Sequence, residues 1–332
     1  MMNHTLKSRC KVSLGTTIQG KWHKNRYIIV KELGFGANGI VYLARNNYQQ
    51  VALKMSDNSI SITSEVNVLK SFAKVQGSSL GPSLLDVDDW ENTKGQISFY
   101  TMEYIEGPDL LTFVSQKGQT WTNVLILQLL SDLEKLHQTG WVFGDLKPEN
   151  LIVTGPPSKI RCIDVGGTTI QGRAIKEFTE FYDRGYWGLG SRKADPSYDL
   201  FAVAMIIINA AYLKRFNKTT GGIEQLRGMI RQKPELVKLE AVLDKALRGE
   251  YTSAKQMRSG LLSIINGTTS KTNQSNRIVP NQRNRNPQGN TQRNSTRSQQ
   301  AKKNRGGGLL ETVTIVATIL FLYFFYIYQQ VL

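Results

Sequence analysis

The sequence predicts an α+β protein with a strand-rich N-terminal lobe and a helical C-terminal lobe, followed by a disordered linker and a C-terminal transmembrane helix. Three observations predict it. Residues 26–54 alternate apolar and polar side chains in short runs broken by glycine. Residues 122–213 contain two long helical patterns of apolar side chains. From residue 268 the chain is first polar and basic and then apolar.

Individual elements follow from the same periodicities. Val66, Leu69 and Phe72 recur at three-residue steps, which predicts a helix over Ser64–Ala73. Another helix begins near Thr122 and has one apolar face. The predicted strands are Tyr27–Lys31, Ile40–Ala44, Val51–Met55, Ile97–Met102 and Lys159–Ile163, and Tyr198–Leu213 is predicted to be a buried helix.

Composition sets the class of protein. The chain has 332 residues and 40% hydrophobic content, enough for one large domain of two lobes with appendages. Cys10 and Cys162 are its two cysteines, and no CxxC pair occurs, which disfavours a disulfide framework and indicates a reducing compartment. We interpret the scattered histidines, His4, His23 and His137, as surface or packing residues, so a zinc site is not expected.

The net charge of +16 is unevenly distributed. Between Thr268 and Arg305 lie nine basic residues and no acid, among polar neighbours with few large apolar groups. Such a segment buries too little surface to offset its ordering entropy, which predicts a disordered linker over 268–308. The linker is a solvated spacer, a clamp on a membrane surface or a contact for DNA, and it lacks the aromatic residues that stack on single-stranded bases.

Residues 312–332 contain no charge and are mostly apolar, which predicts a transmembrane anchor over Leu309–Leu332. Lys302, Lys303 and Arg305 precede it and are expected to stay on the cytoplasmic side. Residues 1–20 contain no apolar segment typical of a signal peptide. We therefore expect a tail-anchored, single-pass protein whose working part faces the cytoplasm.

Glycines and a lysine in the strand-rich region suggest phosphate binding. Gly34, Gly36 and Gly39 are followed by a β-branched strand rather than a helix, as in a hairpin whose backbone amides approach phosphate oxygens. Lys54 ends the next strand and is a candidate to neutralise phosphate charge. The acid best placed to hold its side chain is Glu65, on the following helix.

A second group of polar residues follows in the helical region. Asp145, Lys147 and Asn150 lie in one loop, and Asp164 follows a short strand. Phosphoryl transfer needs an acceptor for the hydroxyl proton, oxygen ligands for magnesium and cations on the transferred phosphate. Asp145 fits the first role, Asn150 and Asp164 the second, and Lys147 with Lys54 the third.

On these motifs, the chain from about Arg26 to Asn266 resembles the eukaryotic-type (Hanks-type) protein Ser/Thr kinases. More narrowly it is similar to the tail-anchored YabT-type kinases of spore-forming bacilli. The resemblance implies the two-lobed protein kinase fold, with ATP and Mg²⁺ or Mn²⁺ as cofactors and protein substrates. The implied ATP-binding residues are Gly34, Gly36, Gly39, Val41, Ala52, Lys54, Glu65, Asp109 for the ribose, and the backbone of Glu103 and Ile105 for adenine; the implied catalytic residues are Asp145 and Lys147, the metal ligands Asn150 and Asp164, and the structural support Asp199.

The predicted organisation is an N-terminal extension over 1–25, a kinase domain over 26–267 whose lobes meet near 105–106, the linker and the anchor. The resemblance also implies a bacterial cell membrane, a role in sporulation, DNA binding through Thr268–Arg305 and self-association for trans-phosphorylation.

Several positions depart from the family pattern. Phe143 and Gly144 replace the His-Arg pair whose Arg commonly binds a phosphorylated activation loop, and Val165 replaces the Phe of the Asp-Phe-Gly motif. The family's Ala-Pro-Glu is missing, its Glu falling near Trp187, and the Arg that would pair with that Glu is missing too. The departures spare the chemical groups, so we expect a working kinase. Two alternatives remain: a pseudokinase scaffold, and a small-molecule phosphotransferase suggested by the Gly144-Asp145 pair.

Overall fold

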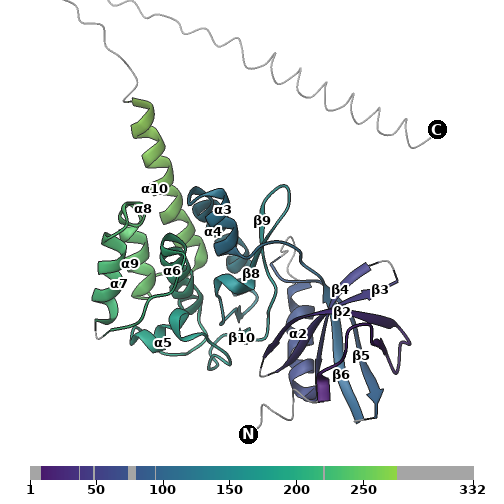
Figure 1. Cartoon of the computed structure of the whole chain (residues 1–332). Coiled ribbons are helices and arrows are strands. Elements are labelled where there is room, and N and C mark those ends of the chain that lie inside the picture. The colour runs from purple at the N-terminus through teal and green to yellow at the C-terminus, as the bar shows by residue number, and fades with distance from the viewer. Residues whose placement is uncertain are drawn as a thin grey trace, which may run out of the picture. The chain divides into compact units, whose positions relative to one another are not determined.

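The computed structural model describes residues 9–36, 38–47, 49–73, 80–93, 95–219 and 221–274, with side chains up to residue 267 (Figure 1). The predicted anchor and most of the predicted linker lie outside these residues. Among the helices that are described, none combines the length and the apolar composition needed to cross a bilayer. The predictions of a membrane span and a DNA-binding linker therefore stay predictions.

The N-terminal lobe is built on a six-stranded antiparallel sheet in the order β1-β2-β3-β4-β6-β5. The predicted strands over 27–55 and 97–102 are confirmed, and β5 adds an edge that sequence reasoning missed. The strands are β1 Thr17–Gln19, β2 Arg26–Gly36, β3 Gly39–Asn46, β4 Gln49–Ser56, β5 Leu84–Asn92 and β6 Gly95–Glu103. Their register places Lys54 of β4 opposite Tyr100 of β6 and Val41 of β3.

Helix α2 (Ser59–Ala73) packs on this sheet through the predicted apolar residues Val66, Leu69 and Phe72, all buried. It begins earlier than the predicted Ser64 because the Asn58 side chain caps it. Asn58 Oδ1 accepts from the backbone N–H of Ile60 at 3.1 Å and of Ser61 at 3.3 Å. The cap extends the helix by a turn that apolar periodicity does not mark.

The segment before the predicted start of the kinase domain at residue 26 packs into the same lobe. Ile18 of β1 pairs with Tyr27 of β2 in antiparallel register. Ile18 and Cys10 are fully buried in the same apolar cluster as the sheet residues Ile29 and Phe99. The short, mixed sequence of this segment carries no periodic signal, and only the core of the lobe gives it a place.

The C-terminal lobe is helical, as predicted. Helix α6 (Pro196–Tyr212) is its centre, and nearly all of its side chains are buried. Around it lie α4 (Thr120–Gln138) and α9 (Glu240–Leu247), and the apolar face of α4 is fully buried. The other elements are α3 Leu110–Lys117, β7 Trp141–Val142, η1 Pro148–Asn150, β8 Leu151–Thr154, β9 Lys159–Cys162, β10 Thr169–Ile170, η2 Glu180–Tyr182, α5 Arg184–Trp187, α7 Gly222–Arg231, α8 Pro234–Val237 and α10 Ala254–Gln274.

Helix α10 runs to Gln274, past the predicted start of the linker at Thr268. Its first half packs on α4, with Met257 and Leu261 fully buried. The linker prediction placed the boundary where the apolar residues stop. A helix continues beyond that point because its backbone hydrogen bonds do not need an apolar face.

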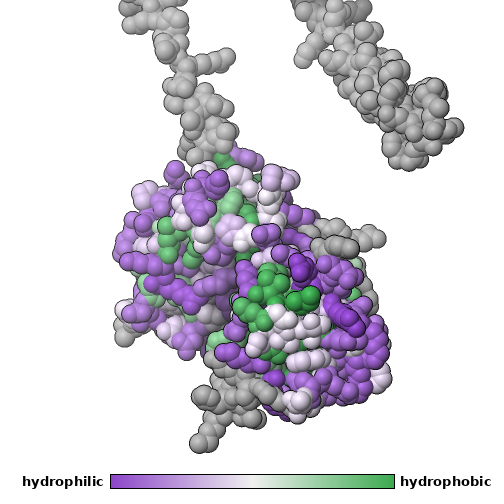
Figure 2. All heavy atoms as spheres, turned by 45° about the vertical axis from the view of Figure 1, so that its right-hand side comes forward, coloured by the Kyte–Doolittle hydropathy of each residue, from purple (hydrophilic) through white to green (hydrophobic). Residues whose placement is uncertain are grey.

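Figure 2, in which the N-terminal lobe comes forward, shows a mostly hydrophilic surface with hydrophobic side chains gathered on this lobe. Strand β2 contributes exposed apolar side chains of this kind, including Ile28, Val30 and Phe35. The Phe35 side chain is 63% exposed at the end of the strand, next to the glycines that roof the cavity described below.

Candidate active site

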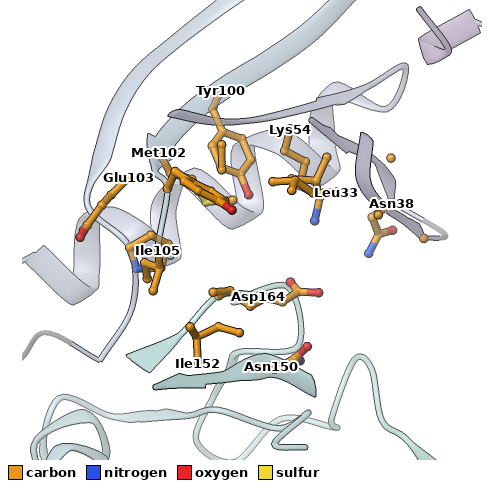
Figure 3. Close-up of a pocket in the computed structure, with 18 of the residues that line it drawn as sticks. Leu33, Asn38, Lys54, Tyr100, Met102, Glu103, Ile105, Asn150, Ile152 and Asp164 are labelled. Atoms are coloured by element: carbon orange, nitrogen blue, oxygen red, sulfur yellow. The ribbon is translucent and has the colours of Figure 1, made fainter. Parts of the chain in front are cut away.

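A cavity of about 370 Å³ lies between the two lobes (Figure 3). The sheet and the Gly-rich hairpin form its roof, β8, β9 and the loops next to them form its floor, and the chain after β6 closes one side. Most of the predicted ATP and metal residues line it: Gly34, Gly36, Gly39, Val41, Ala52, Lys54, Glu103, Ile105, Asn150 and Asp164.

The hairpin between β2 and β3 requires glycine at Gly39. Its φ is +138°, and an added Cβ would lie 2.3 Å from the carbonyl oxygen of Met55 in β4. Only glycine lets the hairpin lie this close to the neighbouring strand. Gly34 and Gly36 have open space around them, which leaves room for a ligand under the hairpin.

Lys54 is held by the predicted partner. Its Nζ lies 2.7 Å from Glu65 Oε2, and both side chains are buried. Burial acts to lower the pKa of Lys54, but the negative charges of Asp164 and Glu65 outweigh it, so this pKa is raised and the ammonium stays charged. Tyr100, which sequence reasoning missed, also binds Glu65: its hydroxyl donates to Oε2 at 2.7 Å.

Asp145 and Lys147 come together in the proposed catalytic loop, residues 143–150. Lys147 Nζ forms an ion pair with Asp145 Oδ2 and lies 3.3 Å from the hydroxyl of Thr179. Thr179 Oγ1 in turn donates to Asp145 Oδ1 at 2.9 Å. Thr179 was not predicted, because a lone threonine carries no signal in the sequence. Both oxygens of Asp145 are thus oriented by partners, as a proton acceptor for a hydroxyl substrate needs.

Asn150 and Asp164 fit a hard divalent cation. Asn150 Nδ2 donates to the carbonyl oxygen of Asp145 at 3.2 Å, which leaves its amide oxygen as an acceptor. The Asp164 carboxylate lines the same cavity, and its Oδ1 also accepts from the backbone N–H of Gly166 at 3.0 Å. Carboxylate and amide oxygens are ligands that magnesium and manganese prefer.

Asp199 of α6 is fully buried and binds the backbone of the catalytic loop. Its carboxylate accepts from the backbone N–H of Phe143 at 2.8 Å and of Gly144 at 2.9 Å. His137 Nε2 lies 2.8 Å from Asp199 Oδ2, so this buried histidine, interpreted from sequence as a packing or surface residue, supports the site. The loop is thus held through its backbone N–H groups, and these hydrogen bonds do not need the family's side chains at 143 and 144.

The two substituted positions have their own structural reasons. Phe143 is fully buried in the apolar core. Gly144 has φ +86°, and an added Cβ would lie 2.6 Å from the carbonyl oxygen of Gly167. This conformation excludes an arginine at 144 in this chain. Gly144 therefore cannot bind a phosphorylated activation loop as the family's Arg does.

A family model described as "Protein kinase domain" matches residues 27–287. The chain belongs to the protein kinase family. It is 54% identical to the serine/threonine-protein kinase YabT of Bacillus subtilis over 335 residues, covering 98% of both chains. It is 26% identical to the sporulation protein kinase mde3 of Schizosaccharomyces pombe over 213 residues, covering 58% of this chain and 38% of mde3. The prediction of a protein serine/threonine kinase is confirmed, and the family uses ATP and a divalent metal.

Two of the predicted nucleotide residues, Glu65 and Asp109, do not line the cavity, and Glu65 binds Lys54 instead. Asp109 Oδ1 accepts from the backbone N–H of Thr112 at 3.0 Å, and its Oδ2 accepts from the Thr112 hydroxyl at 2.7 Å. Asp109 is thus the N-cap of α3. Each carboxylate oxygen keeps a further lone pair as an acceptor, so the ribose contact of Asp109 stays a prediction.

The kinase has a substitute for the family's missing ion pair. Trp187, at the position of the absent acid, is buried beside Phe181 and Phe216. The charges lie on both sides of Trp187 in the sequence. Asp183 is fully buried and binds Arg192, whose Nη2 lies 2.7 Å from Asp183 Oδ2. Arg184 Nη2 lies 2.8 Å from Asp195 Oδ2. These two ion pairs anchor the segment.

Proposed function

We propose that this kinase transfers the γ-phosphoryl group of Mg-ATP to serine and threonine hydroxyls of proteins, using Asp145 as the proton acceptor. The observation that carries the proposal is the orientation of Asp145 by Lys147 and Thr179 beside a cavity that holds Lys54 and Asp164. This arrangement supports turnover and disfavours a pseudokinase scaffold, because each charge needed for transfer has a partner that positions it.

The residues have separate roles in the proposed reaction. Lys54, fixed by Glu65, binds the α- and β-phosphates, and Lys147 stabilises the charge on the transferred group. Asp145 orients the substrate hydroxyl and accepts its proton. Asn150 and Asp164 hold the metal, and magnesium, or manganese in its place, neutralises the phosphate charge when bound. Val41 and Ala52 flank the adenine, and the backbone of Glu103 and Ile105 provides its hydrogen bonds.

The test is phosphate incorporation by the full-length kinase with magnesium and ATP, on itself and on a protein substrate. We expect Lys54→Ala, Asp145→Asn and Asp164→Ala each to lower kcat by about a hundredfold or more. Glu235→Gln, which removes an exposed charge on α8, is the control and should match the parent. Unchanged incorporation in Lys54→Ala and Asp164→Ala would show that this site is misassigned.

A second part of the proposal concerns the predicted anchor. We propose that residues 309–332 hold the kinase in the bacterial cell membrane with its catalytic domain in the cytoplasm. The support is the uncharged run over 312–332, preceded by Lys302, Lys303 and Arg305. Deleting 309–332 should move the protein from the membrane fraction to the soluble fraction without abolishing catalysis. Retention of the truncated kinase in the membrane fraction would contradict the anchor.

We propose that the basic linker receives the signal that sets the activity of the kinase. Its nine cations between Thr268 and Arg305 favour DNA binding, and DNA gathers several kinase copies and raises their effective concentration for trans-phosphorylation. Activity should rise with DNA in the parent but not in a variant with all nine cations changed to Gln, and DNA affinity should fall steeply with salt. Equal activity curves for the two proteins would leave the linker as a spacer.

The similarity to kinases of spore-forming bacilli leads us to propose that the kinase acts during sporulation. The name of the similar S. pombe protein, a sporulation protein kinase, is a further and weaker support. Spore yield in cells that carry only the Asp145→Asn form should fall relative to the parent. Equal spore yields would remove this part of the proposal.

A further inference from the structure

One acidic side chain in the cavity has no role in the reaction proposed above. Glu177 belongs to the segment between β10 and η2, and its partly buried side chain lines the cavity together with Lys54 and Asp164. Sequence reasoning did not single it out, because a lone glutamate in a loop is ordinarily a solvated surface residue.

The position of Glu177 is set from two sides. Its Oε1 accepts a hydrogen bond from Asn38 Nδ2, at the tip of the Gly-rich hairpin. A Cβ added at Gly166 would lie 3.2 Å from Asp164 Oδ1 and 3.5 Å from Glu177 Oε2, so the two carboxylates flank one point. Glu177 therefore lies between the hairpin that covers the phosphates and the predicted metal ligand. When ATP binds with its terminal phosphates between Lys54 and Asp164, these phosphates lie next to Glu177.

The charge of Glu177 is poorly compensated. Among the described residues it has no ion pair, and the nearby ammonium of Lys54 is bound to Glu65 while that of Lys147 is bound to Asp145. Burial raises the pKa of Glu177, the charge of Asp164 raises it further, and the charge of Lys54 offsets only part of this. Negative charge thus exceeds positive charge where the triphosphate binds.

We propose that Glu177 is a specificity-determining residue that makes the nucleotide site discriminate against ATP without a bound metal ion. The inference rests on the nucleotide site proposed above. Free ATP brings its negative phosphates against an uncompensated carboxylate, whereas a divalent cation supplies positive charge between the two. Adenosine has no phosphate and does not sense the carboxylate. Selectivity for metal-bound ATP then arises in part from repulsion of the free nucleotide.

The experiment measures dissociation constants by calorimetry on the full-length chain in detergent. The ligands are ATP with a chelator, ATP with magnesium, and adenosine. In Glu177→Gln the amide keeps the shape and the oxygen that accepts from Asn38, and only the charge is lost. We expect the Kd of metal-free ATP to fall about tenfold, because one Coulomb pair near a protein surface exceeds the free energy of a tenfold change. The Kd of Mg-ATP should change less, and that of adenosine should not change.

Two further variants sharpen the test. Glu180→Gln removes a charge from the same segment outside this cavity, and it should leave the Kd of metal-free ATP unchanged. Asn38→Ala releases Glu177 from its hydrogen bond, so it should tighten metal-free ATP in the parent but not in Glu177→Gln. Melting temperatures of all variants verify that they are folded.

Three results would overturn the inference: equal Kd values for metal-free ATP in the parent and Glu177→Gln, the same gain in Glu180→Gln, or a loss of affinity confined to Mg-ATP. The last would make Glu177 a metal ligand. These failures are distinct from failure of the nucleotide site itself, in which the parent binds neither adenosine nor ATP.

Discussion

The hydroxyl of Tyr100 donates a 2.7 Å hydrogen bond to Glu65 Oε2, the same oxygen that lies 2.7 Å from Lys54 Nζ. The sheet and α2 are thus joined at the side chain that positions the phosphate-binding lysine. Burial and the charge of Glu65 raise the pKa of Tyr100 well above its usual value, so its hydroxyl stays protonated and remains a donor.

Removing this hydroxyl should weaken the lysine site more than the fold. In Tyr100→Phe, Glu65 loses a donor and Lys54 is its remaining partner, so we expect kcat/KM for ATP to fall about threefold to tenfold. The measurement is steady-state phosphorylation with ATP varied. Tyr212→Phe is the matched control, since its hydroxyl donates to the carbonyl oxygen of Met229 far from the cavity. An equal loss in both variants would mean that Tyr100 acts only through stability.

The histidine under the catalytic loop should contribute to both stability and activity. His137→Ala leaves the buried Asp199 carboxylate with one partner fewer, which should lower the free energy of unfolding by about 1–3 kcal/mol. Because Asp199 also holds the backbone before Asp145, kcat should fall as well. Denaturant unfolding and initial rates measure the two effects. The neighbouring exposed substitution Gln138→Ala is the control, and a His137→Ala protein as stable as the parent would contradict the prediction.

Restoring the family's arginine should harm this kinase. Gly144→Arg places a side chain at φ +86° with its Cβ near the carbonyl oxygen of Gly167, so we expect a loss of stability above about 2 kcal/mol and lower activity. The measurement is the melting temperature together with the rate. Gly144→Ala and Gly140→Ala separate backbone strain from the steric clash. Gly140 has φ +84°, close to that of Gly144, but open space around it. A destabilisation of Gly140→Ala equal to that of Gly144→Ala would show that strain alone accounts for the loss.

The loop between β1 and β2 should give stability a pH dependence. A hydrogen bond from His23 Nδ1 to Asp86, 2.6 Å long, and the charge of that carboxylate raise the pKa of His23 above its ordinary 6.5. Asp88 lies 3.9 Å from the same nitrogen. Protonated His23 therefore favours the folded state. This contribution is complete below the unfolded pKa of about 6.5 and is lost as pH rises through the higher folded value.

The corresponding measurement is the melting temperature of the parent minus that of His23→Gln at a series of pH values. The difference should be largest near about pH 6 and should shrink as the pH approaches about 8. Lys24→Gln removes a charge from the same loop but keeps His23 and Asp86, so its difference from the parent should stay level. A His23→Gln difference that does not vary with pH would remove the effect.

The sequence by itself determined the two-lobed architecture and the kinase activity, and it singled out the proposed reacting groups. Strand and helix periodicities placed the elements, and the ordered set of Lys54, Asp145, Asn150 and Asp164 identified the chemistry. These residues could be proposed from the sequence because phosphoryl transfer restricts which side chains serve in each role. The edges of the lobe were not: β1 and the capped start of α2 depend on single contacts rather than on a repeating pattern.

Only the tertiary structure decided which ordinary residues support the site. Asn38 meets Glu177 across 139 positions of chain, His137 meets Asp199 across 62, and Thr179 meets Asp145 across 34. It also showed that Asp109 is the N-cap of α3. Local pattern and composition carry no information on such pairs. The partner of each polar group is set by how the sheet, α6 and the segment between β10 and α5 pack around the shared core, where buried polar groups need hydrogen-bond partners.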